Sequence, residues 1–281
     1  MTGTLKSPIF PLSYHFEAMV SATHTPTVLL TRPAHQARPG RAEPVKTELE
    51  ALGFRVLVQP TIDILPPENW TETDGAIQKL RHRQFDWLIF SSSNGVQFFF
   101  DRIQERGGVS PPVSHHHNIP IAVVGSGTNS TLYNRIGRYA DVVPDIFTAE
   151  SVAETLSVEA GQGKRFLHLR ANRGRDVLKR MLTESGGNVT EIAVYRSVDR
   201  PHADPQIFEL LLSGEIDYVT VTSSAIAASL VKMFGELLRH TSLISISPLT
   251  SETLCSLGFP PRQEAGEASL AGIVAVLSKL R

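Results

Sequence analysis

The sequence predicts an α/β protein with two related units, each a five-stranded parallel sheet covered by helices on both faces. From Thr27 onward, short β-type runs alternate with helical patterns, which is typical of parallel sheets. Residues 85–94 and 216–225 also resemble each other: each has an acidic residue, a short apolar run and a hydroxyl-rich turn. They lie too far apart for a solenoid repeat, and their spacing suits two related domains.

The strands are predicted from short runs of apolar and β-branched residues, and the helices from apolar periodicity between those runs. The predicted strands are 27–31, 55–59, 87–90, 119–124, 141–143, 165–169, 188–194, 218–221, 243–246 and a weaker one at 259–264. The predicted helices are 44–52, 73–83, 96–106, 126–136, 149–159, 175–185, 205–212, 225–238, 249–257 and 270–280. Gly53, Gly137, Gly186 and Gly258 each follow a helical pattern, where a left-handed residue ends the helix.

A second internal match indicates how the chain is divided. Residues 28–32 match 166–170, so first-half and second-half motifs alternate along the chain at residues 28, 87, 166 and 218. Residues 58–64 and 192–198 have the character of extended crossovers between units. We therefore expect a discontinuous domain (24–59 and 197–281), an inserted domain (63–191), crossovers at 60–62 and 192–196, and a disordered extension at 1–23.

Composition excludes several classes of protein. The chain has 281 residues, a formal charge of −1 and a pI near 6.8, so nucleic acid and anionic membranes are poor default partners. Cys255 is the only cysteine, which excludes an intrachain disulfide and a cysteine-rich metal site. No apolar run is long enough to span a bilayer, and residues 1–23 lack the order of a signal peptide. We expect a cytoplasmic protein.

The repeated turns are the first candidate binding site. Ser91, Ser92 and Ser93 follow one predicted strand, and Thr222, Ser223 and Ser224 follow the other. Hydroxyls and backbone N–H groups at a strand end that enters a helix can bind a carboxylate or phosphate. The alternative is that these side chains only cap the helices.

Gly125 and Thr128 form a second candidate with Thr250, because residues 123–128 and 245–250 also match. A Gly-x-Gly turn after a strand suggests phosphate binding, but Ser130 stands where a dinucleotide fingerprint has its third glycine. The hydroxyls of Thr128 and Thr250 are the stronger signal, since each lies in a first helical turn where it can cap the helix or contact an anion.

Tyr195 is the candidate catalytic residue, because it lies in the predicted crossover. A tyrosine between two domains can donate a hydrogen bond or act as a weak acid, or it can simply fill the seam with its ring. Arg170, Arg173 and Arg175 are equally consistent with anion binding and with a solvated helix start. Residues 115–117, three histidines in a proline-flanked loop, are read as a solvated loop, so no metal site is predicted.

The ordered set of motifs resembles the uroporphyrinogen-III synthase family over residues 27–280. The resemblance lies in the order and spacing of short motifs, none of them diagnostic alone. These are Val28-Leu-Leu-Thr-Arg-Pro33, residues 49–53, residues 86–96 with Ile89-Phe-Ser-Ser92, Val124-Gly125 with Thr128, Val194-Tyr195, residues 217–224, residues 246–250 and Leu257-Gly258.

The resemblance implies two flavodoxin-like, doubly wound domains joined by two extended crossover segments. It implies conversion of the linear tetrapyrrole hydroxymethylbilane into uroporphyrinogen III, with loss of water and inversion of ring D, in haem, sirohaem and cobalamin biosynthesis. No metal or organic cofactor is implied. We expect a monomer, because motion between the domains needs a free cleft, with transient hand-over of the substrate from hydroxymethylbilane synthase.

By the same resemblance, Tyr195 matches a tyrosine that assists departure of the hydroxyl, and Ser92, Thr128, Ser223 and Thr250 match hydroxyls that line the family's cleft. Ser247 stands where the family's second copy has glycine, and residues 1–23 are unmatched. The residues themselves also allow a different class of function: a non-catalytic two-domain protein that closes on a small anion.

Overall fold

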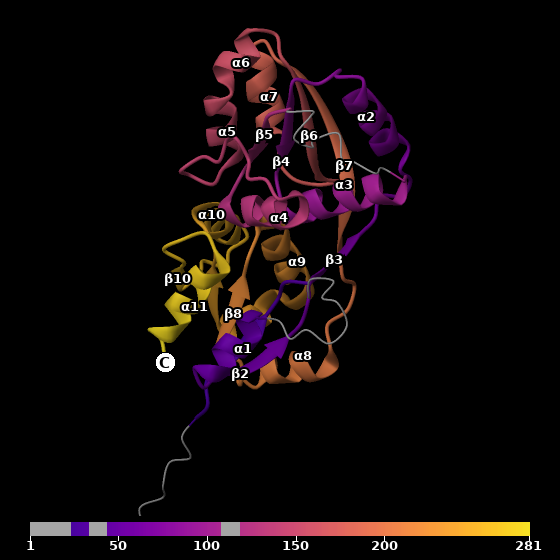
Figure 1. The fold of residues 1–281 in the computed structure, drawn as a ribbon. Coiled ribbons are helices and arrows are strands. Elements are labelled where there is room, and N and C mark those ends of the chain that lie inside the picture. The colour runs from indigo at the N-terminus through magenta and orange to yellow at the C-terminus, as the bar shows by residue number, and fades with distance from the viewer. Residues whose placement is uncertain (1–23, 34–43, 108–118) are drawn as a thin grey trace, which may run out of the picture.

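A computed structural model describes residues 24–33, 44–107 and 119–281, and it contains two five-stranded sheets (Figure 1). The first sheet has the strand order β10-β9-β8-β1-β2, and every pairing in it is parallel. Its strands are β1 (Thr27–Leu30), β2 (Arg55–Val58), β8 (Tyr218–Val221), β9 (Ser242–Ser245) and β10 (Gln263–Glu264). We call this sheet and its helices the first unit.

The second sheet has the order β3-β7-β6-β4-β5. Its strands are β3 (Ile62–Leu65), β4 (Trp87–Phe90), β5 (Ile121–Val123), β6 (Arg165–Ala171) and β7 (Asn188–Asp199). Strands β4 to β7 are parallel, whereas β3 pairs with β7 in the antiparallel direction. We call this sheet and its helices the second unit.

Helices cover both faces of each sheet. In the first unit they are α1 (Pro44–Ala51), α8 (Pro205–Leu212), α9 (Ser224–Phe234), η1 (Gly235–His240), α10 (Pro248–Ser256) and α11 (Leu270–Ser278). In the second unit they are α2 (Thr71–Arg81), α3 (Ser93–Glu105), α4 (Ser126–Ile136), α5 (Ala149–Thr155), α6 (Ser157–Gly161) and α7 (Val177–Glu184). Buried apolar clusters lie on both sides of each sheet.

The registers show that the two units repeat one another. Val28 of β1 pairs with Tyr218 of β8, as Phe166 of β6 pairs with Trp87 of β4. On the other side, Val28 pairs with Val56, as Phe166 pairs with Val189. Strands β1, β2, β8 and β9 therefore correspond to β6, β7, β4 and β5, which agrees with both internal matches in the sequence.

The sequence prediction of wholly parallel sheets is wrong at β3. Residues 62–65, which overlap the end of the predicted crossover 58–64, pair antiparallel with residues 196–199 at the end of β7. One of these segments leaves the first unit and the other returns to it, so they run in opposite directions and can pair only in this way. We call this pair the strap.

Residues 141–143, predicted as a strand, form only a single bridge between Val142 and Ala122. The side chain of Asp141 accepts the backbone N–H of Ile121 at 2.8 Å, and Pro144 supplies no N–H to continue the pairing. The predicted helix 149–159 is also divided, because Leu156 leaves helical geometry between α5 and α6. The four predicted helix-ending glycines all have positive φ, between 71° at Gly137 and 100° at Gly186.

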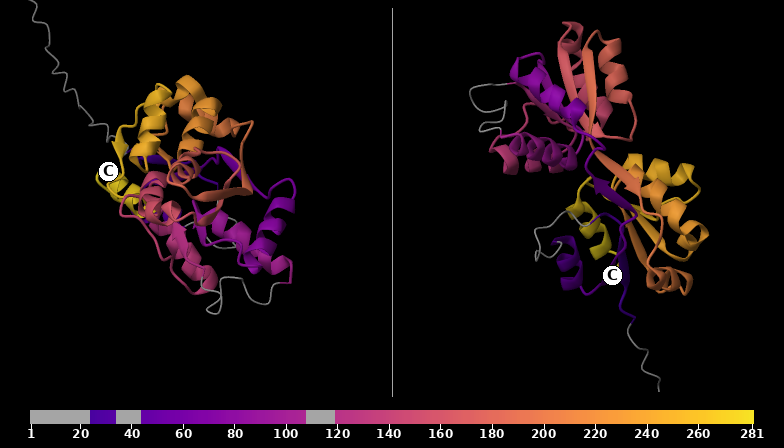
Figure 2. Two further views of the ribbon diagram at one scale, coloured as in Figure 1. Left: turned by 90° about the horizontal axis from the view of Figure 1, so that it is seen from above. Right: turned by 90° about the vertical axis from the view of Figure 1, so that its right-hand side faces the viewer.

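The carboxyl edges of the two sheets face each other. Strand β2 leads out of the first unit at its carboxyl end, into β3, and β7 leads out of the second unit at its carboxyl end, into α8. In Figures 1 and 2 (right), α3 and α4 lie at the end of the second unit nearer the first, and α10 lies at the facing end of the first unit. In open parallel sheets, ligands bind outside the carboxyl ends of the strands.

Candidate active site

The two hydroxyl-rich turns have the same local structure. Ser92 caps α3, where its Oγ accepts a hydrogen bond from the backbone N–H of Gly95 at 3.1 Å. Ser223 caps α9 and accepts from the N–H of Ile226 at 3.2 Å. Both caps have extended backbone geometry, the usual conformation of a residue that precedes the first helical turn. Both serines therefore cap their helices, and the Oγ of Ser92 also contacts the hydroxyl of Tyr195.

The next serine in each turn joins neighbouring helices. Ser93 Oγ donates to the carbonyl of Gly127 at 3.1 Å, and Ser224 Oγ donates to the carbonyl of Leu249 at 3.3 Å. These bonds hold the start of α4 beside α3 and the start of α10 beside α9. Each unit therefore presents two adjacent helix N-termini at its carboxyl edge, where unpaired backbone N–H groups and helix dipoles favour anions.

Tyr195 lies at the carboxyl edge of the second sheet, beside the cap of α3. Its hydroxyl is 3.0 Å from Ser92 Oγ, and its ring stacks on Phe98 with 5.8 Å between the ring centroids. Tyr195 is only 7% exposed. Burial raises the pKa of the Tyr195 hydroxyl, and hydrogen bonds with Ser92 and Asn94 offset part of that rise. The phenol therefore stays protonated at neutral pH.

A β-bulge directs Tyr195 toward this cap. The pairing of β6 and β7 shifts between Arg170 and Ala171, so that Ala171 pairs with Tyr195. In a regular strand, successive side chains point to opposite faces, yet Val194 and Tyr195 both pack in the cluster around α3. Bulges commonly re-aim a side chain next to an active site.

Thr128 and Thr250 occupy matching positions in the first turns of α4 and α10. Thr128 is 7% exposed and Thr250 is 1% exposed, and Thr250 Oγ1 lies 3.2 Å from Ser247 Oγ. Gly125 and Ser247 cap these helices with nearly the same extended backbone, φ −155° and −163°. A serine fits this conformation without strain, so Ser247 does not disturb the turn.

Sequence reasoning missed a polar chain in the second sheet. Ser91 Oγ lies 2.5 Å from Nε2 of His168, and Nδ1 of His168 lies 2.9 Å from Oε1 of Glu191. Arg170 donates to the same carboxylate oxygen at 3.0 Å. Ser91 directly follows β4, whereas His168 and Arg170 lie in β6 and Glu191 lies in β7, and the pairing of these strands brings the four residues together. The sequence signal that could have revealed these hydrogen bonds was a histidine and a glutamate inside two predicted strands.

Burial and the neighbouring hydrogen bonds set the protonation states of His168 and Glu191. Burial lowers the pKa of His168, although Glu191 partly opposes the shift, so the imidazole is neutral near pH 7. Burial alone would raise the pKa of Glu191, but hydrogen bonds from His168 and Arg170 outweigh it and lower that pKa to about 2. The other arginines considered as anion ligands form ion pairs: Arg173 with Asp199 at 2.6 Å and Arg175 with Glu150 at 2.5 Å.

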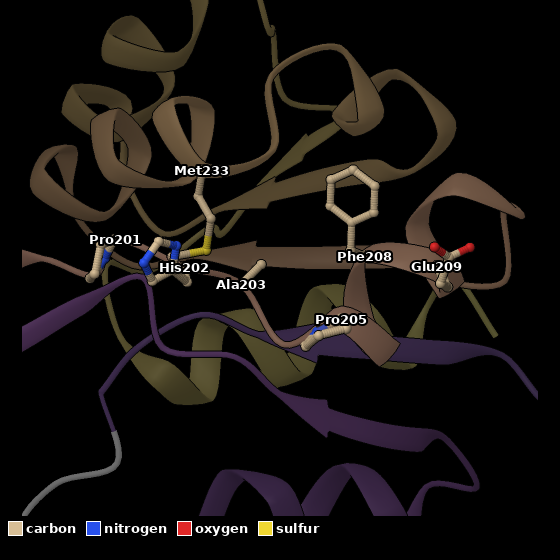
Figure 3. Close-up of a pocket in the computed structure, with 7 residues that line it drawn as sticks. All are labelled: Pro201, His202, Ala203, Pro205, Phe208, Glu209 and Met233. Atoms are coloured by element: carbon tan, nitrogen blue, oxygen red, sulfur yellow. The ribbon is translucent and has the colours of Figure 1, made fainter.

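A surface hollow of about 380 Å³ lies elsewhere, at α8 and α9 of the first unit (Figure 3). Its lining consists of Pro201, His202, Ala203, Pro205, Phe208, Glu209 and Met233. None of the predicted site residues lines it. The hollow is therefore separate from the candidate active site.

The remaining sequence predictions concern membranes and metals. Within the described parts of the chain, every helix is too short or too polar to cross a bilayer. Residues 115–117 and the extension 1–23 lie outside the described residues.

The chain matches known sequences of one family over most of its length. The family model described as "Uroporphyrinogen-III synthase HemD" matches residues 43–275. The chain is 29% identical over 264 residues to uroporphyrinogen-III synthase of Synechococcus elongatus, covering 90% of this chain and 94% of that protein. It is 27% identical to the enzyme of Chlorobaculum parvum, covering 83% and 89%.

Solved structures show the same α/β fold. A mutant uroporphyrinogen III synthase of Thermus thermophilus superposes with a TM-score of 0.63 at 18% identity, covering 90% of this chain and 98% of that one. Uroporphyrinogen-III synthetase of Helicobacter pylori superposes with a TM-score of 0.58 at 20% identity, covering 91% and 100%. The chain belongs to the uroporphyrinogen-III synthase family, a family of cyclising hydro-lyases that act in porphyrin biosynthesis.

Proposed function

We propose that this chain converts hydroxymethylbilane into uroporphyrinogen III between the facing carboxyl edges of its two sheets. The observation that carries this assignment of the site is the Tyr195 hydroxyl, held 3.0 Å from Ser92 Oγ at the start of α3. A protonated phenol at a helix N-terminus suits the opening step of the reaction, in which a hydroxyl group leaves as water. Membership of the family supports the reaction itself.

A hydrogen-bond chain supports Tyr195 as the donor in that step. The N–H of Gly95 donates to Ser92 Oγ, which leaves the Ser92 hydrogen free to donate to the Tyr195 oxygen. Tyr195 then directs its own hydrogen to the departing hydroxyl of the substrate. The chain of bonds polarises each member in the same direction, which strengthens the terminal donor. Loss of the hydroxyl as water, together with loss of the N–H proton of the same pyrrole, gives an azafulvene, which the terminal ring attacks through a spiro intermediate before reopening and closure.

The substrate's carboxylates are proposed to bind at the helix N-termini on both edges. Ser91, Ser92, Ser93, Gly125 and Thr128 lie on the second unit's edge, and Thr222, Ser223, Ser224 and Thr250 on the first unit's edge. Backbone N–H groups and hydroxyls donate to carboxylates without adding positive charge. A polyanion can therefore bind a protein whose formal net charge is −1.

Ser93 and Ser224 have a structural part in this proposal. Their hydrogens are used by carbonyls of the neighbouring helices, so they position donors rather than donate to substrate themselves. Much of the catalysis is then conformational, because azafulvene formation is intrinsically easy and the enzyme must favour the inverted closure. No single side chain is expected to be indispensable.

The proposal includes the division of the chain into two flavodoxin-like domains. The strand order β2-β1-β8-β9-β10 follows the 2-1-3-4-5 order of that fold, and β7-β6-β4-β5 with the bridge at Val142 repeats it. The proposed domains are 24–59 with 197–281, and 63–191, joined by the crossover segments 60–62 and 192–196. We also propose a cytoplasmic monomer that receives its substrate from hydroxymethylbilane synthase.

The isomer of the product tests the activity. Purified protein is incubated with enzymatically generated hydroxymethylbilane, and the porphyrinogen isomers are separated after oxidation. Type III product is expected, whereas type I product alone, as in the uncatalysed reaction, would overturn the assignment. A non-catalytic anion-binding protein would give that second result.

A further inference from the structure

The hydrogen-bonded residues Ser91, His168 and Glu191 have no counterpart at the matching positions of the first unit, all of which the structure describes. The registers that relate the units place Leu30 where His168 stands and Val58 where Glu191 stands. Only the hydroxyl is kept, as Thr222 in place of Ser91. The fold therefore accommodates apolar residues at both positions, and the second unit has a buried imidazole and a carboxylate instead.

Burying the hydrogen-bonded residues Ser91, His168 and Glu191 has an energetic cost that the fold does not require. His168 is 3% exposed and lies on the sheet face covered by an apolar cluster that includes Phe166, Leu156 and Leu182. Moving an imidazole into such surroundings is unfavourable unless both ring nitrogens are paired. Both are paired here, one with Ser91 and one with Glu191. The series of hydrogen bonds ends at Ser91, which is partly exposed at the carboxyl edge of the sheet, beside Ser92.

The order of donors follows from the chemistry of the groups. An ionised Glu191 can only accept, so Nδ1 of His168 carries the hydrogen that is shared with it. A neutral imidazole then has a lone pair on Nε2, which must accept from the Ser91 hydroxyl. The single hydrogen of Ser91 is thereby directed inward, and the Ser91 oxygen presents only lone pairs to the carboxyl edge.

We propose that His168 is a positioning residue that fixes the Ser91 hydroxyl as a hydrogen-bond acceptor for an N–H group of the substrate. A linear tetrapyrrole carries pyrrole N–H groups as well as carboxylates, and an oxygen with only lone pairs attracts the first and repels the second. Ser91 therefore favours a pyrrole ring of the substrate over one of its side-chain carboxylates at this position on the carboxyl edge. The inference rests on the proposed function and refines it at Ser91, whose hydroxyl oxygen contacts a pyrrole N–H group of the substrate in place of a carboxylate.

Ser91, His168 and Glu191 share the connectivity of a nucleophilic triad, but the burial of His168 argues against that role. A catalytic histidine must transfer the nucleophile's proton to the leaving group, which requires access to the substrate. His168 is held in the middle of β6 and is almost wholly covered. Covalent labelling of Ser91 by a fluorophosphonate probe would contradict the positioning role.

A double-mutant cycle tests the inference. Steady-state kcat and KM are measured for Ser91→Ala, His168→Leu and the double variant, with hydroxymethylbilane as substrate. Leucine is the residue that the first unit has at the matching position. Loss of one oriented hydrogen bond is expected to lower kcat/KM by roughly three- to tenfold in each single variant. The double variant is expected to be no slower than Ser91→Ala, because both changes remove the same interaction.

Two further variants separate positioning from folding. Glu191→Gln keeps an acceptor for Nδ1 and is expected to lose less activity than Glu191→Leu. Leu182→Ala, fully buried in the same apolar cluster, is a matched control for destabilisation and is expected to keep near-normal kinetics below its melting temperature. All variants are compared by thermal denaturation.

The outcomes separate this inference from the proposed function. If wild-type protein forms no type III product, the function itself fails. If wild-type protein is active but the losses in Ser91→Ala and His168→Leu multiply in the double variant, only the role of His168 is overturned. The same conclusion follows if His168→Leu behaves like Leu182→Ala.

Discussion

The hydroxyl oxygens of Ser92 and Tyr195 lie 3.0 Å apart although the residues are separated by 103 positions in the chain. Ser92 follows strand β4 and caps α3, and Tyr195 comes from β7, the strand that leads back to the first unit. This contact links the helix start, where carboxylates are proposed to bind, to the group that is proposed to assist loss of the hydroxyl. In the proposed site, substrate binding and chemistry therefore share one series of hydrogen bonds.

Replacing Tyr195 with phenylalanine is expected to slow the reaction without stopping it. The ring keeps its stacking on Phe98, but the hydroxyl donor is lost. We expect kcat to fall roughly 10- to 100-fold, at or below the low end of general-acid effects, because the leaving step is intrinsically easy. Rates of type III formation measure this.

Tyr218→Phe is the matched control, because Tyr218 donates to the carbonyl of Leu280, away from the site, at 3.0 Å. It is expected to lose about 1 kcal/mol of stability and no activity. Unchanged type III rates in Tyr195→Phe would remove Tyr195 from the chemistry.

Ser92→Ala is expected to affect both stability and rate. Loss of the α3 cap should lower the free energy of unfolding by about 1 kcal/mol. Loss of the contact with Tyr195 should in addition lower kcat, and by less in a Tyr195→Phe background. Denaturant unfolding and steady-state kinetics measure the two effects.

Ser269→Ala provides the comparison, since Ser269 caps α11 through the N–H of Gly272 at 3.0 Å and is not a site residue. It should cost similar stability and leave kcat intact. Equal kinetic effects in Ser92→Ala and Ser269→Ala would contradict a specific role for Ser92.

Acidification is expected to destabilise the second unit in two stages. Because His168 has a lowered pKa in the folded state, the unfolded chain binds its proton first, and stability falls as pH falls below the ordinary value of 6.5. The lowered pKa of Glu191 adds a further loss from its ordinary value of 4.5 down to about 2.

Denaturant unfolding of wild-type protein and His168→Leu between about pH 7 and pH 4 measures the first stage. The variant should show a smaller loss of stability over the upper part of this range. Parallel pH dependences in the two proteins would show that His168 does not contribute.

Gly125→Ser is expected to be tolerated. Gly125 has extended geometry, and an added Cβ would meet the Phe147 ring at 3.5 Å, an ordinary contact distance. The matching cap in the first unit is already a serine. We expect a change of less than about 1 kcal/mol in unfolding free energy and nearly normal kinetics. A large loss of activity would indicate that substrate approaches this backbone closely.

The repeated architecture could be predicted from sequence because it is written in local patterns. The runs at Trp87–Phe90 and Tyr218–Val221 form strands with the predicted bounds, and the serines after them cap helices. Alternation of matching motifs along the chain also anticipated how strands are shared between the two sheets. Each of these signals lies within a short window of residues.

The remaining features depend on contacts between distant segments. The antiparallel strap requires two crossovers to lie side by side, which no local pattern of residues 62–65 reveals. The bulge that turns Tyr195 toward Ser92 is a register shift between two strands. The partners of His168 lie in β7 and directly after β4, the two strands beside β6, so these hydrogen bonds could be found only once the strand order was known.

A crystal structure with bound uroporphyrinogen III tests the location of the site most directly. We predict that the tetrapyrrole lies between the facing carboxyl edges, with carboxylates at the N-termini of α3, α4, α9 and α10 and a ring near Tyr195. A product bound instead in the hollow lined by Phe208 and Met233, without contact to either edge, would contradict this location.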